Sequence, residues 1–533
     1  MSNNFEFSKK TTELTKKTVE KGKKGLFSVV FGRTAVVVLL LLIQIGILIA
    51  GVQLLEEKLI YVYGGVTLLT VCLVIFIINK RENPAFMLAW IVPMLSIPIF
   101  GTLLYLFCAI QQEPKILRRR QEKMDWENRS LSQQKPAVMV RLEEESLEQA
   151  NLSHYLGKMG FPTYQNTSVK YFASGEEKFE EMKIQLRKAK SFIFMEYFIV
   201  AKGYMWESIL EILEQKVKEG VEVRFMYDGM CCLALLPYHY PEEIQEKGIQ
   251  CKMFSPVRPV LSTIQNNRDH RKILVIDGQV AFTGGINLAD EYINQKERFG
   301  HWKDTAIMLE GEAVRSFTLM FLKMWNTDKR IVQENFAKYV DVPVRRTPEP
   351  GDGYVVPYSD MPLDDEILGE QVYIDILFNA KKYVHIMTPY LILDYEMLHA
   401  LTYAAKRGVE VIIIMPHIPD KKYAFILAKT YYEELLEAGV QIYEYTPGFV
   451  HAKVFVSDDC KAVVGTINLD YRSFYLHFEC AAMMYRNKEI PNIEKDFQET
   501  LKKCQKVMPG DVRKQGVMNI ITGRVLRLFA PLM

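Results

Sequence analysis

The hydrophobic pattern of the chain begins with a polar, lysine-rich segment, residues 1–33, and then changes sharply. Residues 35–55 and 59–78 are apolar runs, and each is long enough as a helix to cross the hydrocarbon core of a bilayer. Only three charged residues, 56–58, separate the two runs. The pattern therefore predicts a membrane-embedded helical hairpin, with buried helices of a soluble core as the alternative.

A third apolar stretch, residues 84–110, is interrupted by Pro93, Pro98 and Gly101, and basic residues flank both of its ends. Because basic loops stay on the cytoplasmic side, a single crossing would place one basic cluster on the wrong side. A re-entrant or interfacial helical pair avoids this conflict, and a full third span is the alternative. The basic residues 115–123 are expected either to attract anionic lipid or to act only as a topology signal.

Beyond residue 166 the pattern changes to strands that alternate with amphipathic helices. One strand–helix–strand series occurs twice, at residues 192–200, 206–218 and 221–227 and again at residues 384–388, 397–407 and 409–415. A segment rich in proline and glycine, residues 341–365, separates the two series. The predicted fold class is α/β, with two tandem α/β/α halves that form a pseudo-twofold unit after N-terminal transmembrane helices.

These changes of pattern divide the chain into six parts. They are a cytosolic N-terminus (1–33), a membrane region (34–110), a charged connector on the membrane surface (111–166), a first half (167–344), a second half (345–510) and an amphipathic C-terminal segment (511–533). The C-terminal segment is expected to cap the mouth of the site at the membrane surface or to pack on the second half.

Composition sets further limits. Hydrophobic residues make up 49% of the 533, which is high for a wholly soluble chain, and the net charge of +2 offers no general attraction for nucleic acid. The eight cysteines show no CxxC spacing, as expected of reduced thiols. We therefore expect the α/β part to lie on the cytoplasmic side of a membrane.

The residues that suggest chemistry occur in two copies of one pattern. The first copy is HRKILVID followed by GGIN, and the second is HAKVFVSD followed by GTIN. The histidine and the asparagine are 17 residues apart in both copies. The candidate residues are His270, Lys272, Asp277 and Asn287 in the first copy and His451, Lys453, Asp458 and Asn468 in the second.

Each copy predicts a β-hairpin that carries its polar groups at one end. A histidine and a lysine two residues apart on an extended segment project from the same face. Residues 273–276 continue the first strand, Asp277-Gly278 supplies a turn, and residues 280–283 return antiparallel. Asp277 and Asp458 belong to the catalytic pattern, but a turn or supporting hydrogen-bonding role also suits their position after the strand.

Two imidazoles are what phosphodiester exchange through a covalent intermediate requires. One imidazole attacks phosphorus in line, and the other protonates the departing alkoxide and later deprotonates the incoming alcohol. The two lysines and two asparagines of the pattern would bind the phosphate by its non-bridging oxygens. The scheme needs no cofactor and no metal, and the nine histidines show no HExxH or comparable ligand spacing.

A nucleophilic imidazole also needs an acceptor that fixes its other nitrogen. Asp304 lies 34 residues after His270, and Glu479 lies 28 residues after His451, each next to a strand-like run. We predict that these two residues are the orienting carboxylates. Ordinary surface or salt-bridged acids are the alternative.

With these residues the sequence resembles the phospholipase D superfamily, whose signature is the paired HxKx4D motif with a downstream asparagine, and within it the bacterial cardiolipin synthases. The resemblance covers nearly the whole chain and includes NNRDHRKILVIDGQVAFTGGINLADEY, MPHIPDKKYAFILAKTYYEELLEAGVQIYEY, GTINLDYRSFYLHFE and NPAFMLAW. It implies two phospholipase D-like halves, with His270 as the nucleophile and His451 as the general acid. Two departures are visible, Thr466 where a serine is usual and His477 where an asparagine is usual.

The resemblance further implies that two phosphatidylglycerol molecules give cardiolipin and glycerol through a phosphatidyl-histidine intermediate. The expected partners are anionic phospholipid and the bilayer, on the cytoplasmic side of a bacterial plasma membrane, and nucleic acid is not expected. A homo-oligomer is left open. The alternatives are a hydrolase or membrane-tethered nuclease that uses the same histidines, another phosphatidyltransferase, and a lipid-binding scaffold without activity.

Overall fold

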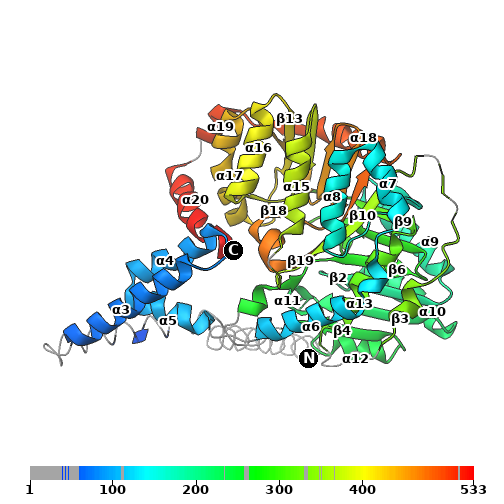
Figure 1. The fold of residues 1–533 in the computed structure, drawn as a ribbon, viewed down its shortest axis with the longest axis horizontal. Coiled ribbons are helices and arrows are strands. Elements are labelled where there is room, and N and C mark those ends of the chain that lie inside the picture. The colour runs from blue at the N-terminus through cyan, green and yellow to red at the C-terminus, as the bar shows by residue number, and fades with distance from the viewer. Residues whose placement is uncertain are drawn as a thin grey trace, which may run out of the picture. The chain divides into compact units, whose positions relative to one another are not determined.

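The computed structural model describes residues 39, 42, 43, 46, 59–109, 113–232, 234–256, 263–328, 334–346, 348–349, 351–364, 366–513 and 516–532 (Figure 1). The chain divides into two compact units, one from residues 1–112 with 257–266 and the other from residues 113–256 with 267–533. The cytosolic N-terminus predicted for residues 1–33 lies outside the described residues.

Three apolar helices belong to the first unit: α3 (Leu59–Ile78), α4 (Pro84–Ser96) and α5 (Pro98–Ala109). Asn83 caps α4, because its side chain accepts a hydrogen bond from the backbone N–H of Ala85 at 2.9 Å. α4 ends before Pro98, since a proline restricts the residue that precedes it to extended conformations. The stretch predicted as a broken helical pair is therefore two helices, and its depth in a membrane stays a prediction.

Within the described residues, no helix combines the length and the apolar character needed to cross a membrane. The first predicted apolar run, residues 35–55, lies almost entirely outside these residues. The predicted transmembrane hairpin is thus not confirmed and stays a prediction.

The second unit contains two large β-sheets with the same strand order. The first sheet has the order β1 (Thr167–Phe172), β9 (Ala306–Gly311), β7 (Val280–Gly284), β6 (Lys272–Ile276), β2 (Phe192–Tyr197), β3 (Glu222–Asp228) and β4 (Gln250–Phe254). The second has the order β10 (Tyr354–Asp360), β19 (His477–Tyr485), β17 (Lys461–Gly465), β16 (Val454–Ser457), β11 (Tyr383–Met387), β13 (Glu410–Pro416), β14 (Gln441–Tyr445) and β20 (Cys504–Lys506). The α/β class is confirmed, and the repeated order is what two copies of one half require.

Helices pack on both sheets (Figure 1). Those of the first half are α9 (Gly175–Lys188), α10 (Tyr204–Lys218), α12 (Tyr240–Gln245) and α13 (Val314–Trp325). Those of the second half are α15 (Leu368–Asn379), α16 (Tyr395–Lys406), α17 (Lys422–Glu437) and α18 (Ile490–Leu501). The helices predicted at residues 206–218 and 397–407 are α10 and α16, shifted by two residues or fewer at each end.

The predicted hairpin of the first motif is confirmed as β6 and β7, which pair antiparallel with Leu274 opposite Phe282. Asp277 and Gly278 both have positive φ, at 53° and 63°, as a type I′ turn requires. Every residue of β6 and β7 is buried, which explains why both strands are almost wholly apolar.

One buried apolar cluster holds the two halves together. It contains Val275 of the first sheet, Val456 of the second sheet and Phe321 of α13. Each side chain buried in this way contributes about 1.5–3 kcal/mol relative to exposure. The shared core therefore packs the two motif strands within one compact unit.

The segment predicted as a charged connector folds as α6 (Glu113–Glu127), α7 (Pro136–Glu145) and α8 (Leu147–Lys158). Leu142 and Ala150 are buried in one cluster with Tyr354 and Tyr485 of the second half. The connector is therefore part of the folded unit, and its predicted place on a membrane surface stays a prediction.

The C-terminal segment forms α20 (Val517–Phe529), which packs on α17. Gly523 makes the close approach, because a Cβ there would lie 2.7 Å from Cγ2 of Thr430. Arg527 lies over the ring of Tyr431 at 4.5 Å from its centroid. Of the two predicted roles, packing on the second half is the one that these contacts support.

Candidate active site

A short pairing of strands between the two halves positions the first motif histidine. β5 (Arg268–Asp269) pairs in parallel with the start of β19 from the other half, where Asp269 lies opposite Phe478. The backbone N–H of His270 then donates to the carbonyl of Phe478 at 2.9 Å. The backbone of His270 is therefore anchored to the second half.

The second motif histidine is positioned in the same way. β15 (Gly448–Val450) pairs in parallel with β8 (His301–Lys303) of the first half. The backbone N–H of His451 donates to the carbonyl of Lys303 at 2.7 Å. Each histidine is thus attached by its backbone to the half that does not contain its own motif.

Each histidine ring is also held by a carboxylate of the opposite half. Nδ1 of His270 lies 2.9 Å from both oxygens of Glu479, and Nδ1 of His451 lies 2.7 Å from Oδ2 of Asp304. Both carboxylates are completely buried. The structure therefore brings the two predicted carboxylates to the two histidines, with the pairing crossed between the halves.

The carboxylates and the burial of the rings set their protonation. An Nδ1–H that donates to a carboxylate leaves the lone pair of the imidazole on Nε2. Burial and the positive charges of Lys272 and Lys453 lower the pKa of His270 well below its usual value. Burial and the charge of Lys453 lower the pKa of His451 to about 4, although Asp304 acts in the opposite direction. Both imidazoles are therefore neutral at pH 7 unless an anion joins them.

The motif lysines supply positive charge to the same place. Lys272 donates to the backbone carbonyl of His270, and Lys453 donates to that of His451. Burial lowers the pKa of Lys272 to about 8 and that of Lys453 to about 7. Because the charges of both lysines and of His451 act on His270, the four groups share one site. A phosphate anion among them would compensate the cost of burying these cations.

The two motif asparagines differ in their bonding. Oδ1 of Asn287 accepts a hydrogen bond from the N–H of Ile199 at 2.9 Å, and its Nδ2 donates to the hydroxyl of Tyr292 at 2.8 Å. Asn468 is also buried, and its Oδ1 has no hydrogen-bond partner among the described residues. Phosphate binding by either amide stays a prediction.

The two motif aspartates support the fold at the opposite end of the motif strand. Asp277 accepts hydrogen bonds from the backbone N–H groups of Lys190, Ser191 and Phe192 at 2.8, 2.7 and 2.9 Å. Asp458 accepts from the equivalent groups of Lys381, Lys382 and Tyr383 at 2.7, 2.8 and 3.0 Å. These bonds favour the supporting role for both aspartates over direct chemistry, although the sequence pattern grouped them with the catalytic residues.

Sequence reasoning missed a buried charge cluster beside His270. Nε of Arg271 lies 2.6 Å from Oε1 of Glu196 and 3.5 Å from Oδ1 of Asp269. All three side chains are buried, and charges buried in proteins are normally paired in this way. The available signal was Glu196, the one charged residue in the otherwise apolar run FIFMEYFIV.

Lys178 of α9 was also missed. Its ammonium donates to the hydroxyl of Tyr197 at 3.2 Å and to the carbonyl of Ile286 at 3.3 Å. Burial lowers the pKa of Lys178 to about 7, while the charge of Asp304 acts in the opposite direction. Its signal was a lysine on the apolar face of an amphipathic helix.

The two departures from the usual motif both lie at Glu479. The hydroxyl of Thr466 donates to Oε2 of Glu479, so threonine keeps a hydrogen bond to this carboxylate. The ring centroid of His477 lies 5.5 Å from that of His270. Neither ring nitrogen of His477 has a hydrogen-bond partner among the described residues. A third buried imidazole therefore lies beside the first motif histidine.

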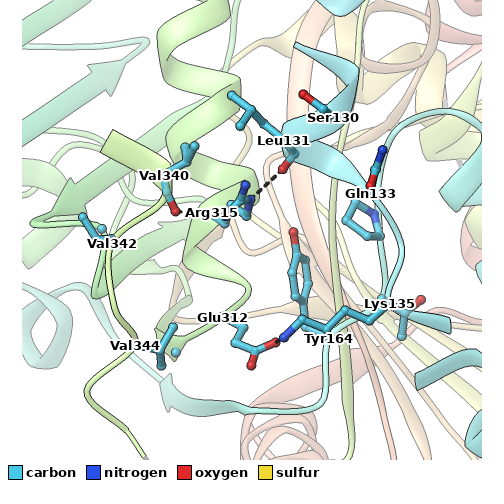
Figure 2. Close-up of a pocket in the computed structure, with 14 residues that line it drawn as sticks. Ser130, Leu131, Gln133, Lys135, Tyr164, Glu312, Arg315, Val340, Val342 and Val344 are labelled. Carbon is cyan, nitrogen blue, oxygen red and sulfur yellow. Dashed lines mark hydrogen bonds and ion pairs between the residues drawn. The ribbon is translucent and has the colours of Figure 1, made fainter. Parts of the chain in front are cut away.

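A separate cavity of about 310 Å³ lies away from this site (Figure 2). Its charged groups are already paired, because Lys135 lies 2.6 Å from Glu312 and Nε of Arg315 donates to the carbonyl of Leu131 at 2.6 Å. Gly278 borders this cavity, and it lies at the end of the motif strand that is opposite to His270. None of the candidate residues lines this cavity.

Comparison with known proteins places the chain in a family. Residues 182–325 and 373–501 match the family model described as "Cardiolipin synthase, PLD-like domain". The chain is 35% identical to a cardiolipin synthase of Geobacillus kaustophilus, across 88% of this chain and 94% of that protein. It is 53% identical to an uncharacterized protein of Streptococcus mutans, across 86% of this chain and 99% of that one.

A solved structure shares the fold. The crystal structure of phosphatidylserine synthase from Haemophilus influenzae has a TM-score of 0.53 and 17% identity, and the match covers 68% of this chain and 93% of that one. At this level of identity the similarity concerns the fold of the paired halves.

Proposed function

The chain belongs to the cardiolipin synthase family with phospholipase D-like domains, and from this premise we propose that it transfers a phosphatidyl group between two phosphatidylglycerol molecules. The products are cardiolipin and glycerol. The observation that carries the proposal is the crossed pairing of His270 with Glu479 and of His451 with Asp304. Each half supplies the carboxylate that orients the histidine of the other half. For this reason we assign the two imidazoles to one reaction.

The first step transfers the phosphatidyl group to the protein. Nε2 of His270 attacks the phosphorus of the donor lipid, a P–N bond forms, and the P–O bond to glycerol breaks. His451, protonated on Nε2 in the lipid complex, gives this proton to the departing oxygen. Lys272 and Lys453 bind the non-bridging oxygens and stabilise the charge that develops on them.

The second step transfers the group to the acceptor. His451, now neutral, takes the proton of a hydroxyl group on the second phosphatidylglycerol. The oxygen of that hydroxyl attacks phosphorus and the P–N bond breaks, which frees His270. The proton is again on His451, so the site returns to its starting state.

The surroundings of the carboxylates support this division of roles. The negative charge of Asp304 raises the pKa of His451 against the effect of burial, as a proton carrier requires. A bound phosphodiester anion would raise the pKa of His451 further, toward the working pH. Burial and the nearby lysines keep His270 unprotonated, as a nucleophile requires.

Phosphatidylglycerol vesicles given to the purified chain test the proposal, with mass spectrometry of the lipid products and an assay for glycerol. We expect cardiolipin and glycerol in equal amounts. Phosphatidic acid without cardiolipin would identify a hydrolase and would overturn the transferase.

We also propose that the site works at the cytoplasmic face of a bacterial plasma membrane, with the N-terminal region as a multi-pass anchor. The lipid substrate and the apolar runs at residues 35–55 and 59–78 support this placement. A protease-sensitive tag on the N-terminus should be cut in inverted membrane vesicles and protected in intact spheroplasts. The opposite pattern of cleavage would contradict the orientation.

A further inference from the structure

Three buried side chains at the first motif histidine form a set of metal ligands. His270, His477 and Glu479 each offer a donor atom, and the three atoms lie within 4.8 Å of one another. Oε1 of Glu479 is the common point, 2.9 Å from Nδ1 of His270 and 3.7 Å from Nδ1 of His477. The sequence analysis singled out both histidines, but it could not predict that they lie side by side, because they are far apart along the chain.

His477 is the residue that the transfer reaction does not explain. Its side chain is 9% exposed, and neither ring nitrogen has a hydrogen-bond partner among the described residues. A buried polar group without a partner costs free energy, and such a group beside two other ligand atoms indicates a ligand that would satisfy it.

The spacing suits a zinc-like divalent ion. Zinc binds imidazole nitrogen and carboxylate oxygen at about 2.0–2.2 Å in tetrahedral sites, so neighbouring donor atoms lie about 3.3 Å apart. The two distances to Oε1 lie on either side of this value. The other oxygen of Glu479 accepts a hydrogen bond from Thr466, which leaves Oε1 for the ion. Two imidazoles and one carboxylate are also a ligand set that zinc prefers.

We propose that His270, His477 and Glu479 form an inhibitory site for a zinc-like divalent cation. The inhibition rests on the proposed function, because it acts on the nucleophile. Coordination through Nδ1 of His270 uses the lone pair of that nitrogen, so the ring proton moves from Nδ1 to Nε2. The atom that attacks phosphorus then carries a hydrogen and has no lone pair, and no net proton is released. The remaining coordination position is filled by water.

The site is tested first by metal binding, without lipid. Isothermal titration of the detergent-solubilised full chain with Zn²⁺ should show one equivalent bound, and Co²⁺ should give the visible absorption of a tetrahedral ion. His477→Asn should weaken the binding at least about 10-fold, the lower end of the loss seen when groups that support a metal site are removed.

His154→Asn is the matched control. His154 is an exposed imidazole on α8 whose Nε2 lies 2.8 Å from Oε1 of Glu143, so it is a histidine–carboxylate pair without a second imidazole. This substitution should leave Zn²⁺ binding unchanged. If His477→Asn unfolds, as judged by circular dichroism, His477→Gln takes its place. A full chain that binds no Zn²⁺, or a folded His477 variant that binds it as the parent does, would overturn the site.

Inhibition is then measured with phosphatidylglycerol vesicles. Zn²⁺ should stop cardiolipin formation by the parent chain, EDTA should restore it, and the residual activity of the His477 variant should resist the same Zn²⁺ concentration. Stoichiometric binding without loss of activity would overturn the inhibitory role. Absence of product without metal, with Zn²⁺ binding intact, would instead count against the proposed transfer reaction.

Discussion

The two halves share one strand order, but they surround their histidines with different side chains. In the first half, His270 lies next to Asp269 and Arg271, which form a buried charge cluster with Glu196. In the second half, Val450 and Ala452 flank His451 in the places of Asp269 and Arg271. Met387 takes the place of Glu196, because each of the two lies opposite the residue three positions after its motif histidine. The duplicated fold thus supplies the same geometry twice, and the charges around it distinguish the two imidazoles.

The orienting carboxylates differ in a related way. Glu479 is shared, because it accepts hydrogen bonds from His270 and Thr466 and lies 3.7 Å from His477. Oδ2 of Asp304 accepts from His451, and the other oxygen accepts from the N–H of Thr305 at 2.8 Å. A dedicated carboxylate suits a histidine that carries a proton, and a shared one suits a histidine that stays neutral.

Alanine at either histidine should give the largest effect, a loss of cardiolipin formation of about 10⁴-fold or more. The leaving group then separates the two roles. A phosphatidyl ester of p-nitrophenol needs no proton on its departing oxygen, so His451→Ala should still release a burst of nitrophenol and retain the phosphatidyl group. His270→Ala should give no burst. Equal bursts from both variants would show that the halves are interchangeable.

The carboxylates should differ in the pH dependence that they control. Asp304→Asn removes a group that raises the pKa of His451, so the proton donor is lost at lower pH. The alkaline limb of the rate profile should therefore move to lower pH, with a loss of about 10²–10⁴-fold at neutral pH. Glu479→Gln should lower the rate without moving this limb. A shift in the Glu479 variant alone would reverse the assignment of roles.

Breaking the charge cluster of the first half should lower the free energy of unfolding much more than replacing the whole cluster with apolar residues. Arg271→Ala leaves Glu196 and Asp269 buried without their partner, and the free energy of unfolding should fall by about 3–5 kcal/mol. The triple variant Glu196→Met, Asp269→Val and Arg271→Ala copies the second half and should recover most of that loss. Chemical denaturation of the three proteins measures both effects. A triple variant less stable than the single one would show that the cluster has no apolar equivalent.

The motif aspartates should give the smallest effect and the same effect in both halves. Asp277→Asn and Asp458→Asn each replace an acceptor oxygen by an amide group that faces a backbone N–H. Each should lower the free energy of unfolding by about 1–3 kcal/mol. Thermal unfolding of the two variants, side by side, checks the equality. Loss of activity without loss of stability would assign these aspartates to the chemistry after all.

Much of the site could be predicted from local sequence, because its hairpins are local. The spacing of His270, Lys272 and Asp277 predicted a strand and a turn, and β6 and β7 lie at the two apolar runs on either side of that turn. Asp304 and Glu479 were also identifiable as carboxylates next to strands. Their crossed pairing was not, because it depends on β5 and β15, which pair with strands of the other half.

The N-terminal region contains a sequence prediction that the described residues do not test. Its hydrophobic runs predicted a membrane hairpin, yet the first of them lies almost entirely outside the described residues. Pro98 marked the break between α4 and α5 correctly, since a proline acts through its immediate neighbour. The metal ligands were invisible for the opposite reason, because nothing local relates His270 to His477.

Because of the crossed pairing, neither half alone contains a histidine together with its carboxylate. A fragment that ends before residue 345 would contain His270 without Glu479, and the remaining fragment would contain His451 without Asp304. Neither piece is a smaller, weaker version of the whole. Activity in a mixture of the two fragments would therefore measure their association. The two fragments could serve as a split-protein reporter.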